Sequence, residues 1–119
     1  MVVKKSRFIG IAKQCSTFED AESFIADVKI EHPKSRHVVF GYVGCNTERS
    51  TDDGEPTGTA GSPVLSAVKG EGLSDTCCVV VRYFGGIKLG AGGLIRAYGG
   101  AAREVLRSAE KVEVVERTR

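Results

Sequence analysis

Two glycine-rich stretches hold most of the residues in this 119-residue chain that could do chemistry. The first, Asp52–Pro63, places three carboxylates within four residues, at Asp52, Asp53 and Glu55. The second, Arg82–Gly93, combines basic side chains with five glycines. Because each glycine costs backbone entropy on folding, such a concentration needs a local reason, for instance tight turns or the close approach of a ligand.

The second stretch has the arrangement of an anion-binding site. A strand is predicted before it and a helix after it, and the first N–H groups of a helix are unpaired and lie at the positive end of its dipole. The common nucleotide motifs do not match, because Ile95 occupies the last glycine position of the dinucleotide fingerprint and Ala91 replaces the lysine of the phosphate-binding loop. A purely structural loop remains the alternative. The residues that we expect to contact an anion or partner are Arg82, Gly85, Gly86, Lys88, Gly90, Gly92, Gly93 and Arg96.

The carboxylates of the first stretch have three candidate uses. We favour pairing with Arg82, Lys88 or Arg96, which would lock the two stretches together. The alternatives are assembly of a ligand site and binding of a hard cation such as Mg²⁺, although EF-hand spacing is absent. The residues that we expect to order the loops are Asp52, Asp53, Glu55, Thr59 and His37.

Catalysis and metal binding receive little support from the sequence. His37 is a candidate base, but no serine or cysteine nucleophile motif accompanies it. Cys77 and Cys78 are adjacent, so in a strand they would point to opposite faces and could not share a zinc ion. We expect buried, reduced thiols rather than disulfides. The predictions are therefore no catalytic residue, no metal and no cofactor, and a non-enzymatic role is favoured while an enzyme stays open as the alternative.

Composition and charge indicate one globular domain over residues 1–119. Hydrophobic residues make up 41% and charged residues 27% of the chain. No apolar run approaches the roughly 18 residues of a membrane span, and no signal peptide is evident, so we predict a cytoplasmic protein without membrane contact. The net charge of +2 does not itself indicate nucleic acid. Residues 82–107, however, carry five basic residues and one acidic residue, which is compatible with a local anion-binding face as well as with an ordinary solvated surface.

Hydrophobic periodicity predicts alternating strands and helices. The predicted elements are a strand over 6–15, a helix from the capping box at 16–19 to about 32, a strand over 38–44, a loop over 45–62, a helix capped by Ser62 and ending near Gly70, a strand over 76–83, a helix over 94–109 and a final strand or linker at 112–116. This order predicts an α/β (α+β) fold. We expect a two-layer sandwich in which a three- to four-stranded sheet carries helices on one face.

Four segments together resemble a known family. They are Lys5-Ser6-x-Phe8, His37-x-x-Phe40-Gly41-Tyr42, DDGEPTGTAGSPVL at 52–65 and VVVRYFGGIKLGAGGLIRAY at 79–98. These segments resemble the N-terminal-type domain of the IMPACT family, which includes bacterial YigZ-like proteins, and the resemblance runs from about residue 4 to residue 106. Many relatives have cysteine where Val39 stands, which argues against a His–Cys catalytic pair.

The resemblance implies a fold like the second domain of ribosomal protein S-five and a role in translation or the amino-acid-starvation response. Eukaryotic relatives restrain the starvation kinase, and some bind actin. Our hypothesis is a non-enzymatic regulatory module that presents the second stretch to RNA phosphate, to a ribosome-associated factor or to an acidic protein surface, with actin as a partner by resemblance. The alternative is an enzyme or small-ligand binder that holds a phosphorylated metabolite in the same loop.

Overall fold

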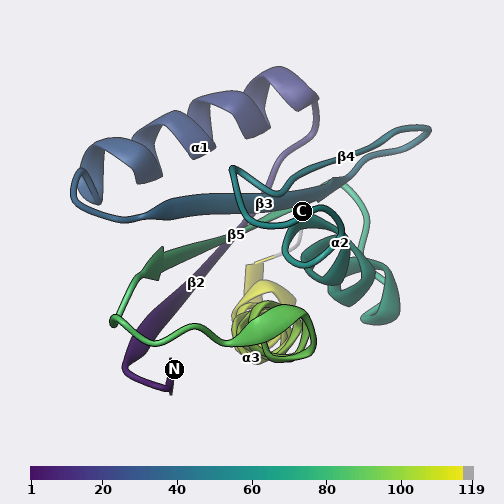
Figure 1. Cartoon of the computed structure of the whole chain (residues 1–119). Helices are drawn as coiled ribbons and strands as arrows, with labels where there is room; N and C mark the ends of the chain where they lie inside the picture. The colour runs from purple at the N-terminus through teal and green to yellow at the C-terminus, as the bar shows by residue number, and fades with distance from the viewer. Residues whose placement is uncertain (117–119) are drawn as a thin grey trace.

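The computed structural model describes residues 1–116 and the side chains of residues 1–108. One open antiparallel sheet has the strand order β1-β2-β5-β3-β4, and three helices pack against it (Figure 1). The elements are β1 (Val2–Val3), β2 (Ser6–Gln14), α1 (Phe18–Glu31), β3 (His37–Val43), β4 (Glu48–Thr51), α2 (Gly61–Gly70), β5 (Thr76–Tyr83) and α3 (Gly90–Glu116). The predicted α+β class is confirmed.

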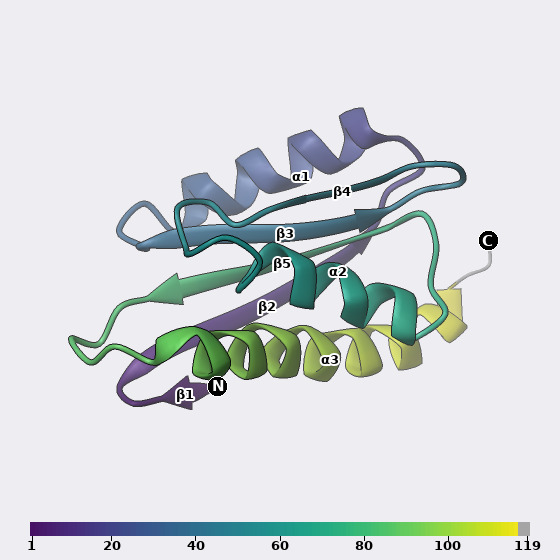
Figure 2. The ribbon, with the colours of Figure 1, turned by 45° about the vertical axis from the view of Figure 1, so that its right-hand side comes forward.

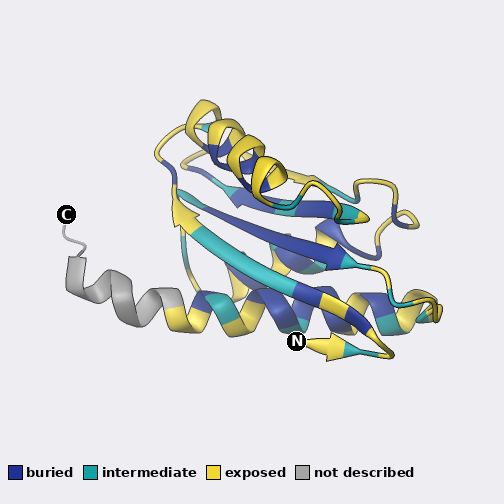
Figure 3. Ribbon diagram, turned by 90° about the vertical axis from the view of Figure 1, so that its left-hand side faces the viewer, coloured by how far each residue is buried: buried dark blue, intermediate teal, exposed yellow. Residues whose placement is uncertain are grey.

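The central strand β5 organises the two hydrophobic cores. Six consecutive residues of β5 are buried, because β2 and β3 flank the strand and helices cover both of its faces (Figure 3). Side chains alternate between the faces of a strand. Val79 and Val81 therefore pack in the core under α1, whereas Cys78 and Val80 pack in the core under α2 and α3. The predicted strand over 76–83 is confirmed with the same bounds.

The predicted placement of all helices on one face is wrong. α1 lies on one face of the sheet, and α2 and α3 lie on the other (Figures 1 and 2). The physical reason is that β3 and β5 bear apolar side chains on both faces, so a helix on a single side would leave half of them in water. The molecule is thus a three-layer arrangement rather than the expected two-layer sandwich.

The sheet has five strands instead of the predicted three or four. The two additional strands are short and lie at the edges. β4 falls within the segment predicted as loop and pairs with β3 from Phe40 to Val43. Three of its four residues are exposed, so the strand carries no apolar alternation that sequence reading could detect.

Three predicted element ends differ in the structure. Thr17, not Ser16, caps α1, and its hydroxyl accepts a hydrogen bond from the backbone N–H of Asp20 at 3.2 Å. α2 begins at Gly61 after Ala60 and has no side-chain cap of its own, so Ser62 does not cap it. α3 begins at Gly90 and extends to Glu116, so residues 112–116 are helical rather than a strand or linker.

All four cysteines are free thiols, and three of them are buried. Cys45 is exposed, which differs from the expectation of four buried thiols. Within residues 1–116 no helix is both long and apolar enough to span a membrane.

Candidate functional site

Both glycine-rich stretches lie at one end of the sheet, where four connections meet. Antiparallel neighbours bring the start of β2 and of β3 to the end at which β5 and β4 finish. Figure 2 shows these connections side by side at the left-hand end of the molecule. A cleft of about 360 Å³ opens among them, lined by Arg36, His37, Glu55, Pro56, Arg82, Phe84, Lys88, Leu89, Gly90, Ala91 and Leu94.

A buried ion pair joins the first stretch, hereafter the acidic loop (Asp52–Pro63), to the second, the basic loop (Arg82–Gly93). Arg82 Nη1 donates to Glu55 Oε2 at 2.6 Å, and the two side chains are only 6% and 4% exposed. The hydroxyl of Tyr98, on α3, donates to the same carboxylate oxygen at 2.5 Å. Burial and the hydrogen bond to Glu55 raise the pKa of Tyr98 well above its usual range. The structure therefore brings Glu55 and Arg82 together as the locking hypothesis requires.

The second amino group of Arg82 extends this network to the N-terminal hairpin. Arg82 Nη2 donates to Ser6 Oγ at 3.3 Å, and the same oxygen accepts from the backbone N–H of Gly85 at 3.2 Å. Arg82, which the sequence places among the anion-contacting residues, is thus held inside the protein by two side chains. Ser6 was not among the predicted site residues, although it belongs to the Lys5-Ser6-x-Phe8 segment that carries the family resemblance.

The N-cap residue of α2, Ala60, has no side chain that can accept a hydrogen bond, and Asp52 supplies this acceptor from the preceding loop. Its Oδ2 accepts from the N–H of Gly58 at 3.0 Å, and its Oδ1 accepts from those of Ala60 and Gly61 at 3.2 and 2.8 Å. Burial acts to raise the pKa of Asp52, but the three backbone hydrogen bonds outweigh it and leave that pKa below its ordinary value. Thr59 is buried, and its hydroxyl donates to the backbone carbonyl three residues earlier at 2.6 Å.

Asp53 and His37 tie the acidic loop to β3. Asp53 Oδ2 accepts from the N–H of Val38 at 2.7 Å, and the Asp53 carbonyl lies 2.6 Å from His37 Nδ1, which must therefore be the donor. His37 Nε2 lies 3.6 Å from Glu55 Oε1. The hydrogen bond from Nδ1 fixes the orientation of the ring, and Nε2 lies beside the buried carboxylate of Glu55. This geometry fits the loop-ordering role that the sequence predicts for His37.

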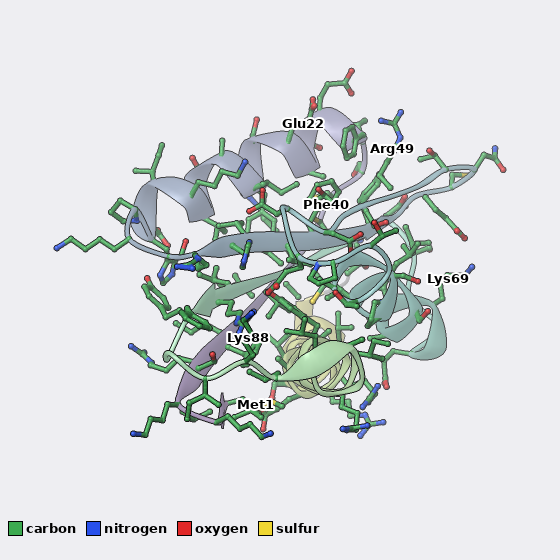
Figure 4. All side chains as sticks on the ribbon, in the orientation of Figure 1. Met1, Glu22, Phe40, Arg49, Lys69 and Lys88 are labelled. Carbon is green, nitrogen blue, oxygen red and sulfur yellow. The ribbon has the colours of Figure 1, made fainter. Side chains whose placement is uncertain are left out.

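The charged side chains beyond Arg82 make no comparable contacts with the described residues. Lys88 and Arg96 are exposed, and among the described side chains neither forms a salt bridge, so the predicted pairing with the acidic loop falls to Arg82 alone. Figure 4, in which α3 is viewed almost end-on, shows Lys88 beside its first turn. Arg96 folds back toward this turn, since a Cβ added at Gly92 would lie 3.4 Å from Arg96 Nη1.

The start of α3 leaves its backbone accessible. Gly86 and Gly90 have φ of +88° and +77°, a region that L side chains rarely adopt. The first turn of α3 contains Gly90, Gly92 and Gly93, and it holds no acidic residue. Small residues cannot shield the unpaired N–H groups of this turn from a ligand, and no carboxylate of the turn neutralises the helix dipole.

Sequence reading missed further residues at this end of the molecule. Arg36, in the connection before β3, stacks over the ring of Phe84 at 4.8 Å, and Phe84 is 40% exposed. Lys4 and Lys5 form the tip of the β1–β2 hairpin. An isolated basic or aromatic residue carries no recognisable spacing, so only the topology could place these side chains beside the basic loop. Among the side chains that the structure describes, no three His, Cys, Asp or Glu are grouped so as to hold a metal ion.

The comparisons with known proteins agree with this fold and with these segments. The model of the Impact N-terminal domain matches residues 4–106. The chain therefore belongs to the IMPACT family, which confirms the resemblance inferred from its four motifs.

Three bacterial family members are similar over most of the chain. An IMPACT family member of Haemophilus influenzae is 47% identical over 98% of this chain and 59% of its own length. YvyE of Bacillus subtilis is 48% identical over 95% of this chain and 54% of its own, and YigZ of Escherichia coli is 44% identical over 88% and 54%. The chain thus spans slightly more than half the length of these relatives.

Two solved structures share the fold. One, described as a hypothetical protein, superposes with a TM-score of 0.87 at 43% identity and covers 90% of this chain and 54% of its own. The other, the two-domain translational regulator Yih1, gives a TM-score of 0.59 at 24% identity over 91% of this chain and 44% of its own. At that identity the second similarity establishes the fold alone.

Proposed function

We propose that this domain is a non-enzymatic binding and regulatory module of translation or of the starvation response. In this proposal it presents the basic loop and the start of α3 to an anionic partner, either RNA phosphate or an acidic protein surface. The observation that carries the proposal is the unequal use of charge in the two loops. The acidic loop bonds within the protein, whereas Lys88 and Arg96 remain exposed beside an uncovered helix N-terminus.

Several features support an anionic partner. Lys88 and Arg96 combine with the free N–H groups of α3, and such a combination attracts phosphate and carboxylate groups. Arg36, Lys4 and Lys5 add positive charge at the same end of the sheet. The family membership and the description of one fold relative as a translational regulator support a role in translation, and we propose that this role is exercised in the cytoplasm. Actin is a candidate partner by family resemblance only.

Binding to RNA can be tested by its dependence on salt. If about four phosphates of a single strand are contacted, affinity should fall roughly 50-fold between 50 and 200 mM salt, because counterions are released on binding. The measurement is fluorescence anisotropy with a labelled 20-nucleotide RNA. The Lys88→Glu/Arg96→Glu variant should bind at least about tenfold more weakly at 50 mM salt. If neither salt nor the double substitution changes the affinity, RNA is not recognised electrostatically and the proposal is wrong.

The cleft favours a second candidate function, the binding of a small phosphorylated metabolite. Its lining combines Lys88, Gly90 and Ala91 with the apolar residues Phe84 and Leu94, and its volume of about 360 Å³ suits a small molecule. A thermal-shift screen of nucleotides and sugar phosphates tests this candidate. A ligand at 100 times its Kd stabilises a protein by about 2.7 kcal/mol, and no shift with any phosphate would count against the candidate.

A further inference from the structure

The hairpin that joins β1 to β2 has an unfavourable sequence for its backbone geometry. Val3 pairs with Ser6, so Lys4 and Lys5 form a two-residue turn, hereafter the lysine turn. Both residues have positive φ, +47° for Lys4 and +69° for Lys5. Positive φ at both central positions is the type I′ arrangement, for which Asn-Gly is strongly preferred. Two lysines in this region place their Cβ atoms in steric conflict with the backbone.

The basic loop holds the lysine turn in this conformation. A Cβ built at Gly85 would collide with the carbonyl group of Lys5, so the two backbones are in direct contact. Ser6 Oγ accepts from the N–H of Gly85 at 3.2 Å, and the same oxygen accepts from Arg82. The buried network therefore fixes the strained turn next to the loop that carries Lys88. Both lysine side chains are exposed.

Strain that the surroundings maintain suggests a use for the side chains that cause it. A type I′ turn of Asn-Gly would give the same hairpin with less strain, so the fold does not require lysine at either position. Among the described side chains neither lysine forms a salt bridge, so intramolecular pairing does not explain their presence. What the two residues add to this end of the molecule is two positive charges.

We propose that the lysine turn is a second cationic contact for single-stranded RNA, held in a strained hairpin so that its charges lie beside the basic loop. This inference rests on the proposed function and extends it to a partner class. RNA is favoured over an acidic protein by the apolar groups among the charges: Phe84 is 40% exposed and Ile87 is 41% exposed. A single strand offers unstacked bases to such groups as well as phosphates to the lysines.

The test replaces the turn by its preferred sequence, Lys4→Asn/Lys5→Gly. This variant should be more stable than the wild type, with a melting temperature higher by roughly 5 °C, because the steric conflict is removed. It should nevertheless bind a labelled 20-nucleotide RNA at least about fivefold more weakly at 50 mM salt and with a shallower salt dependence. Higher stability together with weaker binding separates a functional role from a structural one.

Two controls isolate the contribution of charge. Lys4→Gln/Lys5→Gln keeps a strained turn and removes both charges, so it should lose the same affinity without the gain in melting temperature. Lys13→Gln/Lys69→Gln removes two charges elsewhere on the surface and should bind RNA like the wild type. In Figure 4 Lys69 lies well away from Lys88. An equal loss of affinity in this second control would indicate a net-charge effect and overturn the inference.

The outcomes also distinguish this inference from the proposed function. If Lys88→Glu/Arg96→Glu weakens RNA binding and the Asn-Gly variant does not, only the role of the lysine turn is wrong. If neither variant weakens binding, the electrostatic function itself is wrong. A lower melting temperature of the Asn-Gly variant would show that the turn is not strained. If the Asn-Gly variant weakens binding to a 20-residue polyglutamate but not to RNA, the partner class is an acidic protein.

Discussion

The acidic and basic loops lie side by side but use their charged residues in opposite ways. In the acidic loop, Asp52 caps α2, Asp53 bonds to β3 and Glu55 lies buried between Arg82 and Tyr98. In the basic loop only Arg82 takes part in such bonding, while Lys88 remains exposed, as does Arg96 just beyond the loop. Two glycine-rich loops can therefore differ in role: the acidic loop bonds within the protein, and the basic loop leaves its lysine exposed, as the proposed contact with a partner requires.

The largest expected effect is the loss of the buried carboxylate. Glu55→Ala leaves Arg82 as an unpaired buried charge, so we expect the free energy of unfolding to fall by about 3–5 kcal/mol in urea titrations. The control is Glu48→Ala, which removes an exposed partner of Lys69 and should cost at most about 1 kcal/mol. Equal effects of the two substitutions would contradict a locking role for the acidic loop.

Removing the Asp52 side chain, which caps α2 from outside the helix, should have the next largest effect on stability. Asp52→Ala loses an acceptor for three backbone N–H groups, and we expect about 2 kcal/mol of destabilisation in the same titrations. Asp52→Asn retains one carbonyl oxygen and should lose less. An unchanged free energy of unfolding in Asp52→Ala would show that these hydrogen bonds add nothing to stability.

The lowered pKa of Asp52 should make the stability of the protein depend on pH. Folding lowers the pKa of Asp52 beneath its ordinary value of 3.8, so its ionised form stabilises the native state. This contribution should be complete above pH 3.8 and should disappear as the pH falls through the lower, folded-state pKa. The difference in unfolding free energy between wild type and Asp52→Ala should therefore shrink below pH 3.8, and a difference that grew there would contradict the sign.

A smaller effect is expected from the third member of the buried network. Tyr98→Phe removes the hydroxyl that donates to Glu55 and keeps the packed ring, so the predicted loss is about 1.5 kcal/mol. Tyr83→Phe, whose hydroxyl lies 2.6 Å from His32 Nδ1 in a partly buried position, is the matched control and should cost less. A larger loss of stability from Tyr83→Phe than from Tyr98→Phe would show that the hydrogen bond to Glu55 is not the more stabilising of the two.

The smallest effect on stability is predicted for the basic loop. Lys88→Ala and Arg96→Ala should each change the unfolding free energy by less than about 0.5 kcal/mol, because both side chains are exposed and unpaired among the described residues. A loss comparable to that of Asp52→Ala in either variant would show that the basic loop is structural as well.

The parts of the fold that could be predicted from sequence are those with strong hydrophobic patterns. β5 has the predicted bounds because its apolar run is continuous, and α1 follows from its apolar spacing before Pro33. β4 could not be predicted, because exposed polar residues form it and only its pairing with β3 defines it. The two-sided arrangement of helices also escaped prediction, since one sequence does not show which strand faces meet which helix.

Part of the candidate site was predictable, but Ser6, Arg36 and Tyr98 were not among the predicted residues, and the pairings were harder to predict than the members. The sequence suggested that a carboxylate of the acidic loop meets a base in or just after the basic loop, but three acids and three bases were equally placed to do so. The sheet order determines which pair forms, because β3 lies between β5 and β4 and Glu55, which follows β4, reaches Arg82 near the end of β5. The lysine turn could not be predicted, because two consecutive lysines are not a turn signal. The positive φ values of the two residues follow from the register of the β1–β2 hairpin.

We propose that the exposed charge at the basic loop binds a partner without holding the fold together. The most direct test measures, on one preparation of Lys88→Glu/Arg96→Glu, both the urea midpoint and the affinity for a labelled 20-nucleotide RNA at 50 mM salt. We expect a midpoint close to that of the wild type and an affinity lower by at least about tenfold. Unchanged affinity, or a loss of affinity that accompanies a large fall in the midpoint, would contradict it.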